Sequence, residues 1–245
     1  MEILYNMEMP TKQIFLLAGL FLFIQFIIFS YLVHKDIFTS IDFNTTVRFQ
    51  DNISRSFDNE FSFLSDVGKF EVTTLVLLAI FVVTRKVMAG VAAFSMYVVF
   101  HPIELFGKFF VNHPPPPQFM LRTEHILNFP QFHVRTENSY PSGHSGRTIF
   151  ISVILLILLW KTKRIPTLMK FVLAGLILGF DAAMLISRVT LGEHWATDVI
   201  GGSILGAACG FFAGMFLVNN DRNHHGKGEK KSLFPKYRLE LKKVE

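Results

Sequence analysis

Residues 13–33 read QIFLLAGLFLFIQFIIFSYLV, and this stretch contains no charged side chain. A helix needs about 20 consecutive apolar residues to cross the hydrocarbon core of a bilayer, and this run is long enough. Lys12 precedes it, and no small-residue cleavage signal follows its apolar core. We therefore expect a retained membrane-spanning helix here rather than a signal peptide that is removed.

Similar apolar runs return along the rest of the chain. Of its 245 residues, 51% are hydrophobic and 28 are Phe, which is far from the composition of a soluble protein. The runs predict six spans, at 13–33, 70–84, 88–111, 147–160, 168–187 and 198–218. We expect an all-α fold, a six-transmembrane-helix bundle that forms one integral membrane domain over residues 1–218.

The positions of the basic residues predict how the bundle is oriented. With the N-terminus in the cytoplasm, the inner connections carry Arg85, Lys86, Lys161, Lys163, Arg164 and Lys170. A basic tail at 219–245 follows on the same side and is expected to lie on anionic lipid. This arrangement obeys the positive-inside rule, so we expect a multi-pass cell-membrane protein with both termini cytoplasmic.

The net charge of +5 does not predict a nucleic-acid partner, because the basic residues lie between apolar spans rather than on one soluble face. In the predicted topology the outer side receives residues 34–69, the loop 112–146 and the stretch from Arg188 to Asp198. The membrane lipids are the partners that this composition predicts.

Two of the outer segments have recognisable patterns. Within residues 35–68, apolar side chains recur at four-residue intervals, at Phe49, Ile53, Phe57 and Phe61. This spacing predicts an interfacial amphipathic helix on the outer membrane surface. The loop 112–146 contains the run Pro114–Pro117, which cannot be helical, so we expect it to project as an extended extracytoplasmic loop.

A cation, an imidazole and a carboxylate stand at fixed intervals near the C-terminal end. Ser187-Arg188 is followed by five residues, His194, three more residues and Asp198. On a helix, His194 and Asp198 share one face and can hydrogen-bond. The carboxylate would fix the imidazole tautomer and leave the other ring nitrogen able to attack phosphorus. Taken alone, a His–Asp pair at this spacing is more often an Asp at the start of a helix beside a histidine at the membrane interface.

A second motif, Pro141-Ser142-Gly143-His144, forms a turn into the span that follows. The amide N–H groups, the Ser142 hydroxyl and the positive end of the helix together suit a phosphate oxygen. The alternative is a purely structural one, an ordinary turn with an N-cap. Lys108 and Arg188 close two spans on the inferred outer face, where positive charge is not favoured by topology, and a bound anion would explain both.

Together these residues resemble the type 2 phosphatidic acid phosphatase superfamily, in its membrane-integrated lipid phosphatase branch. Its signatures are Lys-x6-Arg-Pro, Pro-Ser-Gly-His and Ser-Arg-x5-His-x3-Asp, and the second and third are complete here. The resemblance covers roughly residues 36–218. It implies a phosphatase that uses neither a cofactor nor a metal.

The resemblance also implies a role for each matching residue. His194 would attack phosphorus and become a phosphohistidine, with Asp198 orienting it, and His144 would protonate the departing oxygen. Four further residues would hold the phosphoryl oxygens, namely Lys108, Ser142, Gly143 and Arg188.

The first signature is incomplete. Counting from Lys108, its arginine should stand at position 115, where this chain has Pro115. Proline has no donor, so one phosphate contact must be lost or supplied from elsewhere. The candidates are Arg122, Arg135, His113 and Arg147, with a preference for Arg122 or Arg135 because a loop can reach back over the site.

The predicted substrate is a lipid phosphate with an outward-facing phosphoryl group. Undecaprenyl-pyrophosphate-like lipids, phosphatidylglycerophosphate and phosphatidate all fit, and a polyprenyl pyrophosphate is favoured. Two alternatives remain: a lipid phosphotransferase that uses the same site, and a noncatalytic membrane transporter or scaffold. The sequence predicts no oligomeric state.

Overall fold

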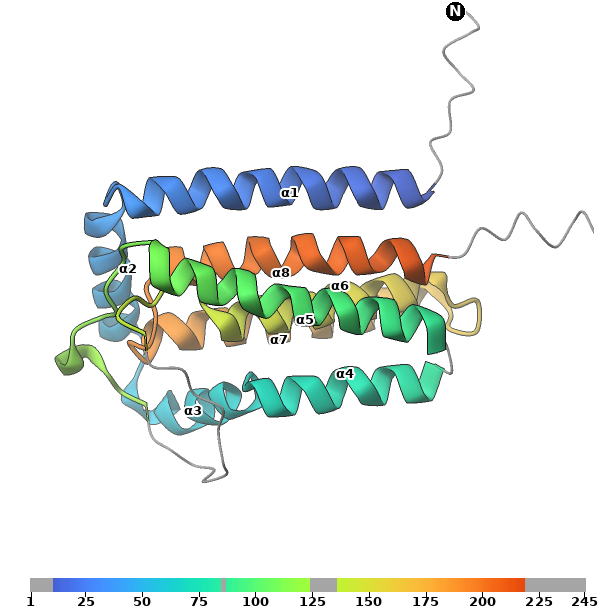
Figure 1. Ribbon diagram of the computed structural model, residues 1–245. Helices are drawn as coiled ribbons and strands as arrows, with labels where there is room; N and C mark the ends of the chain where they lie inside the picture. The colour runs from blue at the N-terminus through green and yellow to red at the C-terminus, as the bar shows by residue number, and fades with distance from the viewer. Residues whose placement is uncertain (1–10, 85–86, 124–135, 219–245) are drawn as a thin grey trace, which may run out of the picture.

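The computed structural model describes residues 11–84, 87–123 and 136–218, and all regular elements in these ranges are helices. Arg135 and the basic tail at 219–245 lie outside them. Six long helices run alongside one another (Figure 1): α1 (Thr11–His34), α4 (Phe70–Thr84), α5 (Val87–Phe110), α6 (Gly143–Lys161), α7 (Thr167–Thr190) and α8 (Ala196–Leu217). They coincide with the six predicted spans, so the all-α bundle is confirmed.

Five of these helices are long and apolar enough to cross a membrane alone, and the sixth span is broken. Helix α4 has 15 residues, or about 22 Å, which is less than the apolar thickness of a bilayer. It is preceded by the 3-10 turn η1 (Arg55–Phe57) and helix α3 (Asp58–Val67), which meet it at a bend of 59°. The chain is a multi-pass membrane protein with five spans, or six if the bent pair counts as one.

Helix α8 lies at the centre and is in contact with α1, α5 and α6. Its backbone touches that of α6, since a Cβ on Gly206 would lie 2.1 Å from the carbonyl oxygen of Gly146. Small residues permit this close packing of spans. Phe100, Phe150 and Leu205 are fully buried around the contact. The first turns of α6 and α8, which carry the two histidine motifs, are therefore held at a fixed separation.

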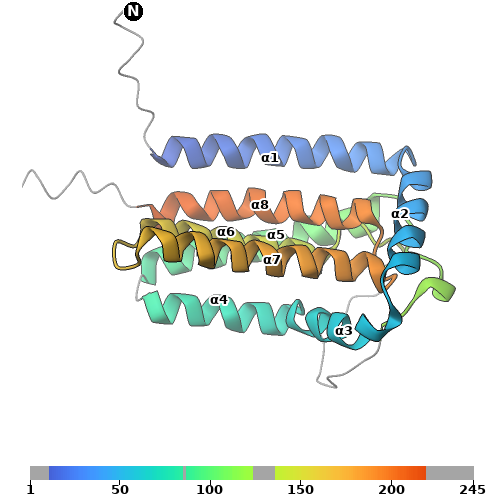
Figure 2. The same cartoon turned by 180° about the vertical axis from the view of Figure 1, so that it is seen from behind.

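One end of the bundle gathers the segments that carry the motifs. Helix α2 (Thr39–Asn52) crosses this end, and α3 lies at its edge (Figures 1 and 2). The first turns of α6 and α8 and the last turns of α5 and α7 lie at the same end. The start of α1 and the end of α8 lie at the opposite end, together with the α6–α7 connection.

The predicted amphipathic helix is wrong in one respect, because it is two helices rather than one. Helix α2 ends at Asn52, and Ile53 and Ser54 are extended, with ψ of 118° and 143°. The last carbonyl groups of a helix have no partner within it. Here the Arg122 side chain donates hydrogen bonds to two carbonyls at this end, Gln50 O at 2.8 Å and Ile53 O at 3.4 Å. Ser54 then caps the next turn by accepting from Ser56 N.

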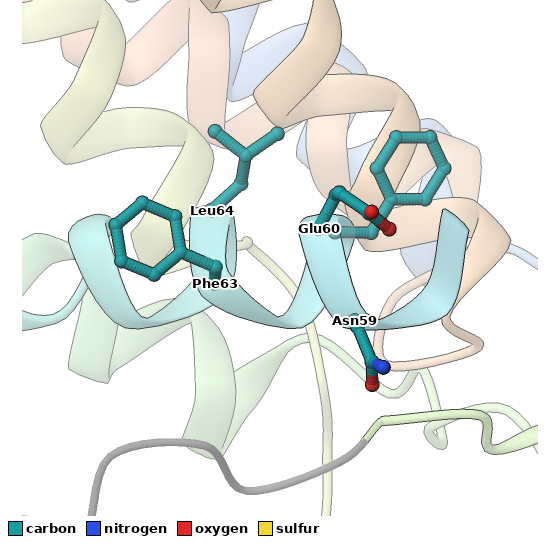
Figure 3. Close-up of a pocket in the computed structure, with 5 residues that line it drawn as sticks. Asn59, Glu60, Phe63 and Leu64 are labelled. Atoms are coloured by element: carbon teal, nitrogen blue, oxygen red, sulfur yellow. The ribbon is translucent and has the colours of Figure 1, made fainter. Parts of the chain in front are cut away.

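The buried faces of α2 and α3 are polar, which reverses the pattern of a soluble helix. Their buried side chains include Asp42, Thr46, Ser62, Ser65 and Asp66. The side chain of Phe63, by contrast, is 51% exposed. It lines an open hollow on the surface of α3 together with Asn59, Glu60, Phe61 and Leu64 (Figure 3). The two helices therefore turn their polar side chains towards the end of the bundle where the motifs meet.

Candidate active site

A cavity of about 950 Å³ opens at the motif-bearing end of the bundle. One part of its wall is polar, and this part includes Lys69, Lys108, His144, Arg147, Glu193 and His194. Another part comes from α4 and α5 and is mainly apolar, with Phe70, Phe94, Tyr97, Val98 and Leu105. Both motif histidines therefore line one cavity that joins a charged region to an apolar one.

His194 lies just before α8 and is bonded to the carboxylate of Asp198. The distance from His194 Nδ1 to Asp198 Oδ2 is 3.3 Å, and the same oxygen accepts from the backbone N–H of Trp195 at 3.0 Å. Asp198 is fully buried, whereas His194 reaches the cavity. A carboxylate on Nδ1 leaves Nε2 as the ring nitrogen available to attack.

His144 stands in the first turn of α6, and its ring contacts the bend between α3 and α4. A Cβ on Gly68 would lie 2.9 Å from His144 Cδ2, so only glycine fits at this corner without moving the ring. Among the described residues, no group hydrogen-bonds to the buried Nε2 of His144. Its side chain lines the cavity with that nitrogen uncommitted, as a proton donor or acceptor requires.

Ser142 and Gly143 have different positions at the start of α6. The Ser142 side chain is fully buried and caps the helix, accepting from Ser145 Oγ at 3.1 Å. Its backbone N–H donates to Asp198 O at 3.0 Å, which ties the two motifs together. Gly143 lines the cavity, but Ser142 does not.

Three cationic or ionisable side chains surround Glu104 on the α5 side of the cavity. Its carboxylate lies 3.4 Å from Arg147 Nη1, 3.5 Å from His101 Nδ1 and 3.7 Å from Lys108 Nζ. Arg147 also donates to the carbonyl of Gly68, from Nε at 3.3 Å and Nη2 at 3.2 Å. Glu104 and the Gly68 carbonyl thus hold the Arg147 guanidinium at the cavity wall beside Lys108.

Arg188 is fully buried behind Glu193, which stands between it and the cavity. Arg188 Nη1 lies 2.5 Å from Glu193 Oε2 and also donates to Ser65 Oγ, while Nη2 donates to Phe61 O at 3.3 Å. Burial acts to raise the pKa of the Glu193 carboxyl, but Arg188 and hydrogen bonds from Thr123 and Ser65 outweigh it and lower that pKa. Glu193 is therefore ionised at neutral pH and neutralises Arg188.

The structure separates the candidates for the missing motif arginine. Arg147 lines the cavity, whereas Arg122 is engaged by Gln50 and Ile53 and does not line it. His113 is also buried away from the cavity, next to Asp42 and Asp198. Arg135 lies outside the described residues. The preferred loop residue Arg122 is thus placed elsewhere, and the α6 residue Arg147 stands beside Lys108.

The motifs did not predict every residue of this cavity. Glu193 stands inside the third signature, where the pattern specifies only spacing. Lys69 lines the cavity from the α3–α4 bend and lies 2.5 Å from Asp66. A signal for the bend was present, since polar residues recur on one face of α3 at Ser62, Ser65 and Asp66 and continue to Lys69. That face is the one turned towards the cavity.

The fold and the cavity define an all-α, multi-pass membrane protein with a paired-histidine site at one end of its bundle. The PAP2 superfamily matches residues 72–222, which is more than half of the chain, and the chain belongs to this superfamily. A search of curated proteins gave no significant match.

Two solved structures have the same fold. The first transmembrane PAP2 type phosphatidylglycerolphosphate phosphatase from Bacillus subtilis is 17% identical, with a TM-score of 0.62, and the match covers 87% of this chain and 98% of that one. LpxE from Aquifex aeolicus is 18% identical, with a TM-score of 0.50, over 71% of this chain and 94% of that one. At these identities the likeness establishes the fold alone.

Proposed function

We propose that this chain is a membrane phosphatase that hydrolyses a lipid phosphate or pyrophosphate through a phosphohistidine, without a metal. The observation that carries the proposal is that His144 and His194 line one cavity beside Lys108 and Arg147, with His194 bonded to a buried carboxylate. Phosphoryl transfer needs a nucleophile, an acid for the leaving oxygen and positive charge around the phosphoryl group. All three are present in this cavity.

In the first step, His194 Nε2 attacks phosphorus, and the bond between phosphorus and the lipid oxygen breaks. His144 gives its proton to the departing oxygen. Asp198 accepts from Nδ1–H and stabilises the positive charge that develops on the His194 ring. In the second step His144 takes a proton from water, whose oxygen attacks phosphorus. The bond between phosphorus and His194 breaks, and inorganic phosphate leaves.

The phosphoryl oxygens are proposed to lie against Lys108, Arg147 and the Gly143 N–H, at the positive end of α6. Ser142 supports this end of the helix by capping it. For Arg188 to bind a phosphoryl oxygen, the substrate must take the place of the Glu193 carboxylate, which now occupies its guanidinium. Arg147 supplies the contact that Pro115 cannot make.

The proposed substrate is amphipathic, because the cavity joins these charges to the apolar wall from α4 and α5. Among lipid phosphates we favour a polyprenyl pyrophosphate, since Lys69, paired with Asp66 at 2.5 Å, lines the same cavity and can meet a second phosphoryl group. We place the cavity on the outer membrane face. The basic α6–α7 connection, with Lys161, Lys163 and Arg164, lies at the opposite end of the bundle, so both termini would be cytoplasmic.

The test of this function is phosphate release by the protein purified in detergent. The substrates are a polyprenyl pyrophosphate, phosphatidylglycerophosphate and phosphatidate, each assayed with excess chelator. We expect release from at least one of them, undiminished by the chelator, because two histidines and the cavity cations carry the chemistry. A requirement for added divalent metal would contradict the mechanism. Transfer only in the presence of an alcohol acceptor would instead identify a phosphotransferase.

Arg147→Gln is expected to reduce kcat/KM, mostly by raising KM. The loss of one pair of charge-assisted hydrogen bonds to phosphate, at about 1.5–3 kcal/mol, corresponds to about 10- to 100-fold. Arg147→Lys keeps the charge but not the planar pair of donors, and it should recover only part of this loss. Initial rates over a range of substrate concentrations measure the effect.

The matched control is Arg122→Gln, which removes the other described candidate. Arg122 bonds only to the backbone at the end of α2 in the contacts described above, so its loss is expected to lower the thermal midpoint and leave kcat/KM within about twofold. If Arg122→Gln raised KM and Arg147→Gln did not, the phosphate contact would belong to the loop instead.

A further inference from the structure

The two oxygens of Asp198 have different surroundings, and only one is explained by the proposed mechanism. Oδ2 accepts from His194 and from the Trp195 N–H. Oδ1 is buried and makes no hydrogen bond with the described residues, although His113 Nε2 lies 3.5 Å from it. A buried carboxylate oxygen without a donor is costly. His113 is therefore the group that faces this side of the carboxylate.

His113 Nε2 faces three oxygen atoms at once. Besides Asp198 Oδ1, it lies 3.5 Å from Asp42 Oδ2 and 3.2 Å from Thr197 Oγ1. The Thr197 hydroxyl donates to Asp42 Oδ2 at 2.6 Å, and its backbone N–H donates to Oδ1 at 2.9 Å. Because the single hydroxyl proton goes to Asp42, Thr197 can only accept from His113. Nε2 therefore carries a proton, and it points between two carboxylates.

The backbone around His113 is fixed from the other side. Its N–H donates to Asn138 Oδ1 at 2.9 Å, and its carbonyl accepts from Ser139 N and Ser139 Oγ at 3.0 and 3.1 Å. The ring of Tyr140 meets the His113 ring edge to face. The His113 side chain is 7% exposed, and its ring cannot turn towards the cavity without losing its contacts with Tyr140 and Thr197.

Two buried carboxylates this close to one imidazole depend on it electrostatically. Burial raises the pKa of the Asp42 carboxyl, while the hydrogen bonds from Thr197 and the nearby His113 act to lower it. Asp198 is more deeply buried than His194, and the His113 imidazole faces its Oδ1. Without His113, Oδ1 of Asp198 would face no donor among the described residues, and the carboxylate would hold His194 Nδ1–H less firmly.

We propose that His113 is a positioning residue: together with Asp42 and Thr197 it holds the Asp198 carboxylate aimed at His194, and it does not bind phosphate. This inference rests on the proposed phosphatase function. It assigns a role to the outer segments that carry no catalytic motif, since Asp42 comes from α2 and His113 from the loop after α5. The groups that face His113 are Asp42, Asp198, Thr197 and Tyr140.

The test is a comparison of kcat and KM for His113→Gln and the wild type. We expect kcat to fall about 10- to 100-fold, with KM unchanged within about twofold, because the variant loses the group that orients the partner of the nucleophile and keeps the groups that bind substrate. Asp42→Asn leaves the imidazole in place but removes one of the oxygen atoms that it faces. It should lower kcat by less than His113→Gln does.

The matched control is His34→Gln. His34 also holds the loop after α5, accepting from the Asn112 N–H at 3.2 Å, but it is exposed and does not line the cavity. Its kcat and KM should equal those of the wild type. If His113→Gln raised KM and left kcat unchanged, His113 would be a phosphate contact. Unchanged kcat and KM would also overturn the proposal.

A second readout does not need turnover, so it separates this proposal from the proposed function. Diethyl pyrocarbonate acylates unprotonated imidazole nitrogens, and mass spectrometry gives the rate at His194. We expect His113→Gln and Asp198→Asn to slow this reaction several-fold, and His34→Gln to leave it unchanged. Equal rates in the wild type and His113→Gln would overturn the proposal, even if the wild type released no phosphate from any lipid.

Discussion

Replacing His194 with Asn is expected to reduce phosphate release to background, a loss of about 10⁴-fold or more. Removing a covalent nucleophile leaves only binding and charge stabilisation, and losses of this size follow in other enzymes. Asparagine keeps a polar side chain of similar reach, so Asp198 retains a partner. Phosphate release under saturating lipid phosphate measures the effect.

The matched control for this change is His34→Asn, at an exposed histidine outside the cavity. It should retain wild-type turnover. The thermal midpoints of both variants in detergent should lie within a few degrees of the wild type, which shows that the bundle is intact. If His194→Asn kept activity within tenfold of the wild type, His194 would not be the nucleophile.

The second large effect is expected for His144→Asn, and it should depend on the leaving group. A general acid contributes about 10²- to 10⁴-fold when the departing oxygen is strongly basic. A lipid monophosphate releases an alkoxide-like oxygen and should show the full loss. A lipid pyrophosphate and p-nitrophenyl phosphate both release much weaker bases, and both should lose less.

The measurement is kcat for these three substrates with the wild type and His144→Asn. A steeper dependence on leaving-group basicity in the variant is the signature of a lost acid. Equal losses on all three substrates would mean that His144 only supports the structure of the cavity. The Gly68 contact offers a check, because Gly68→Ala displaces the same ring without removing it.

The bundle was predictable because a membrane span can be recognised from the length of a single apolar run in the sequence. An uninterrupted apolar run such as 13–33 must be a helix in lipid, since every backbone polar group has to be satisfied within the segment. The break between α2 and α3 was not predictable in the same way. Arg122 donates to carbonyls at the end of α2 from a loop about 70 residues further along the chain. No local pattern in residues 49–61 contains that contact.

Periodicity also predicted the two faces of α3, since an amphipathic helix on a membrane surface turns its apolar face to lipid. The Phe-rich face would be the buried one in a soluble protein. Here Phe63 is exposed, and Ser65 on the polar face contacts Arg188. In a membrane protein the apolar face meets lipid, so the polar stripe marks the functional side. Read in this way, the stripe from Ser62 to Lys69 would have pointed to the α3–α4 bend as part of the site.

Spacing predicted the contact between His194 and Asp198, although His194 lies just before α8 and not on the helix as expected. It did not identify the contacts that cross between helices. Spacing could not place the Arg147 side chain at the cavity wall, since its direction depends on Glu104 and the Gly68 carbonyl. Glu193 was missed because nothing in its neighbourhood distinguishes a carboxylate that covers Arg188 from one that faces solvent.

The phosphohistidine mechanism is tested most directly by a search for the covalent intermediate. The protein is mixed with a lipid pyrophosphate carrying ³²P at the terminal phosphoryl group, quenched within one turnover, and digested. We expect an acid-labile, base-stable label on the peptide that contains His194, absent in His194→Asn. Phosphate release by the wild type with no such label at any quench time, or a label on a different residue, would contradict it.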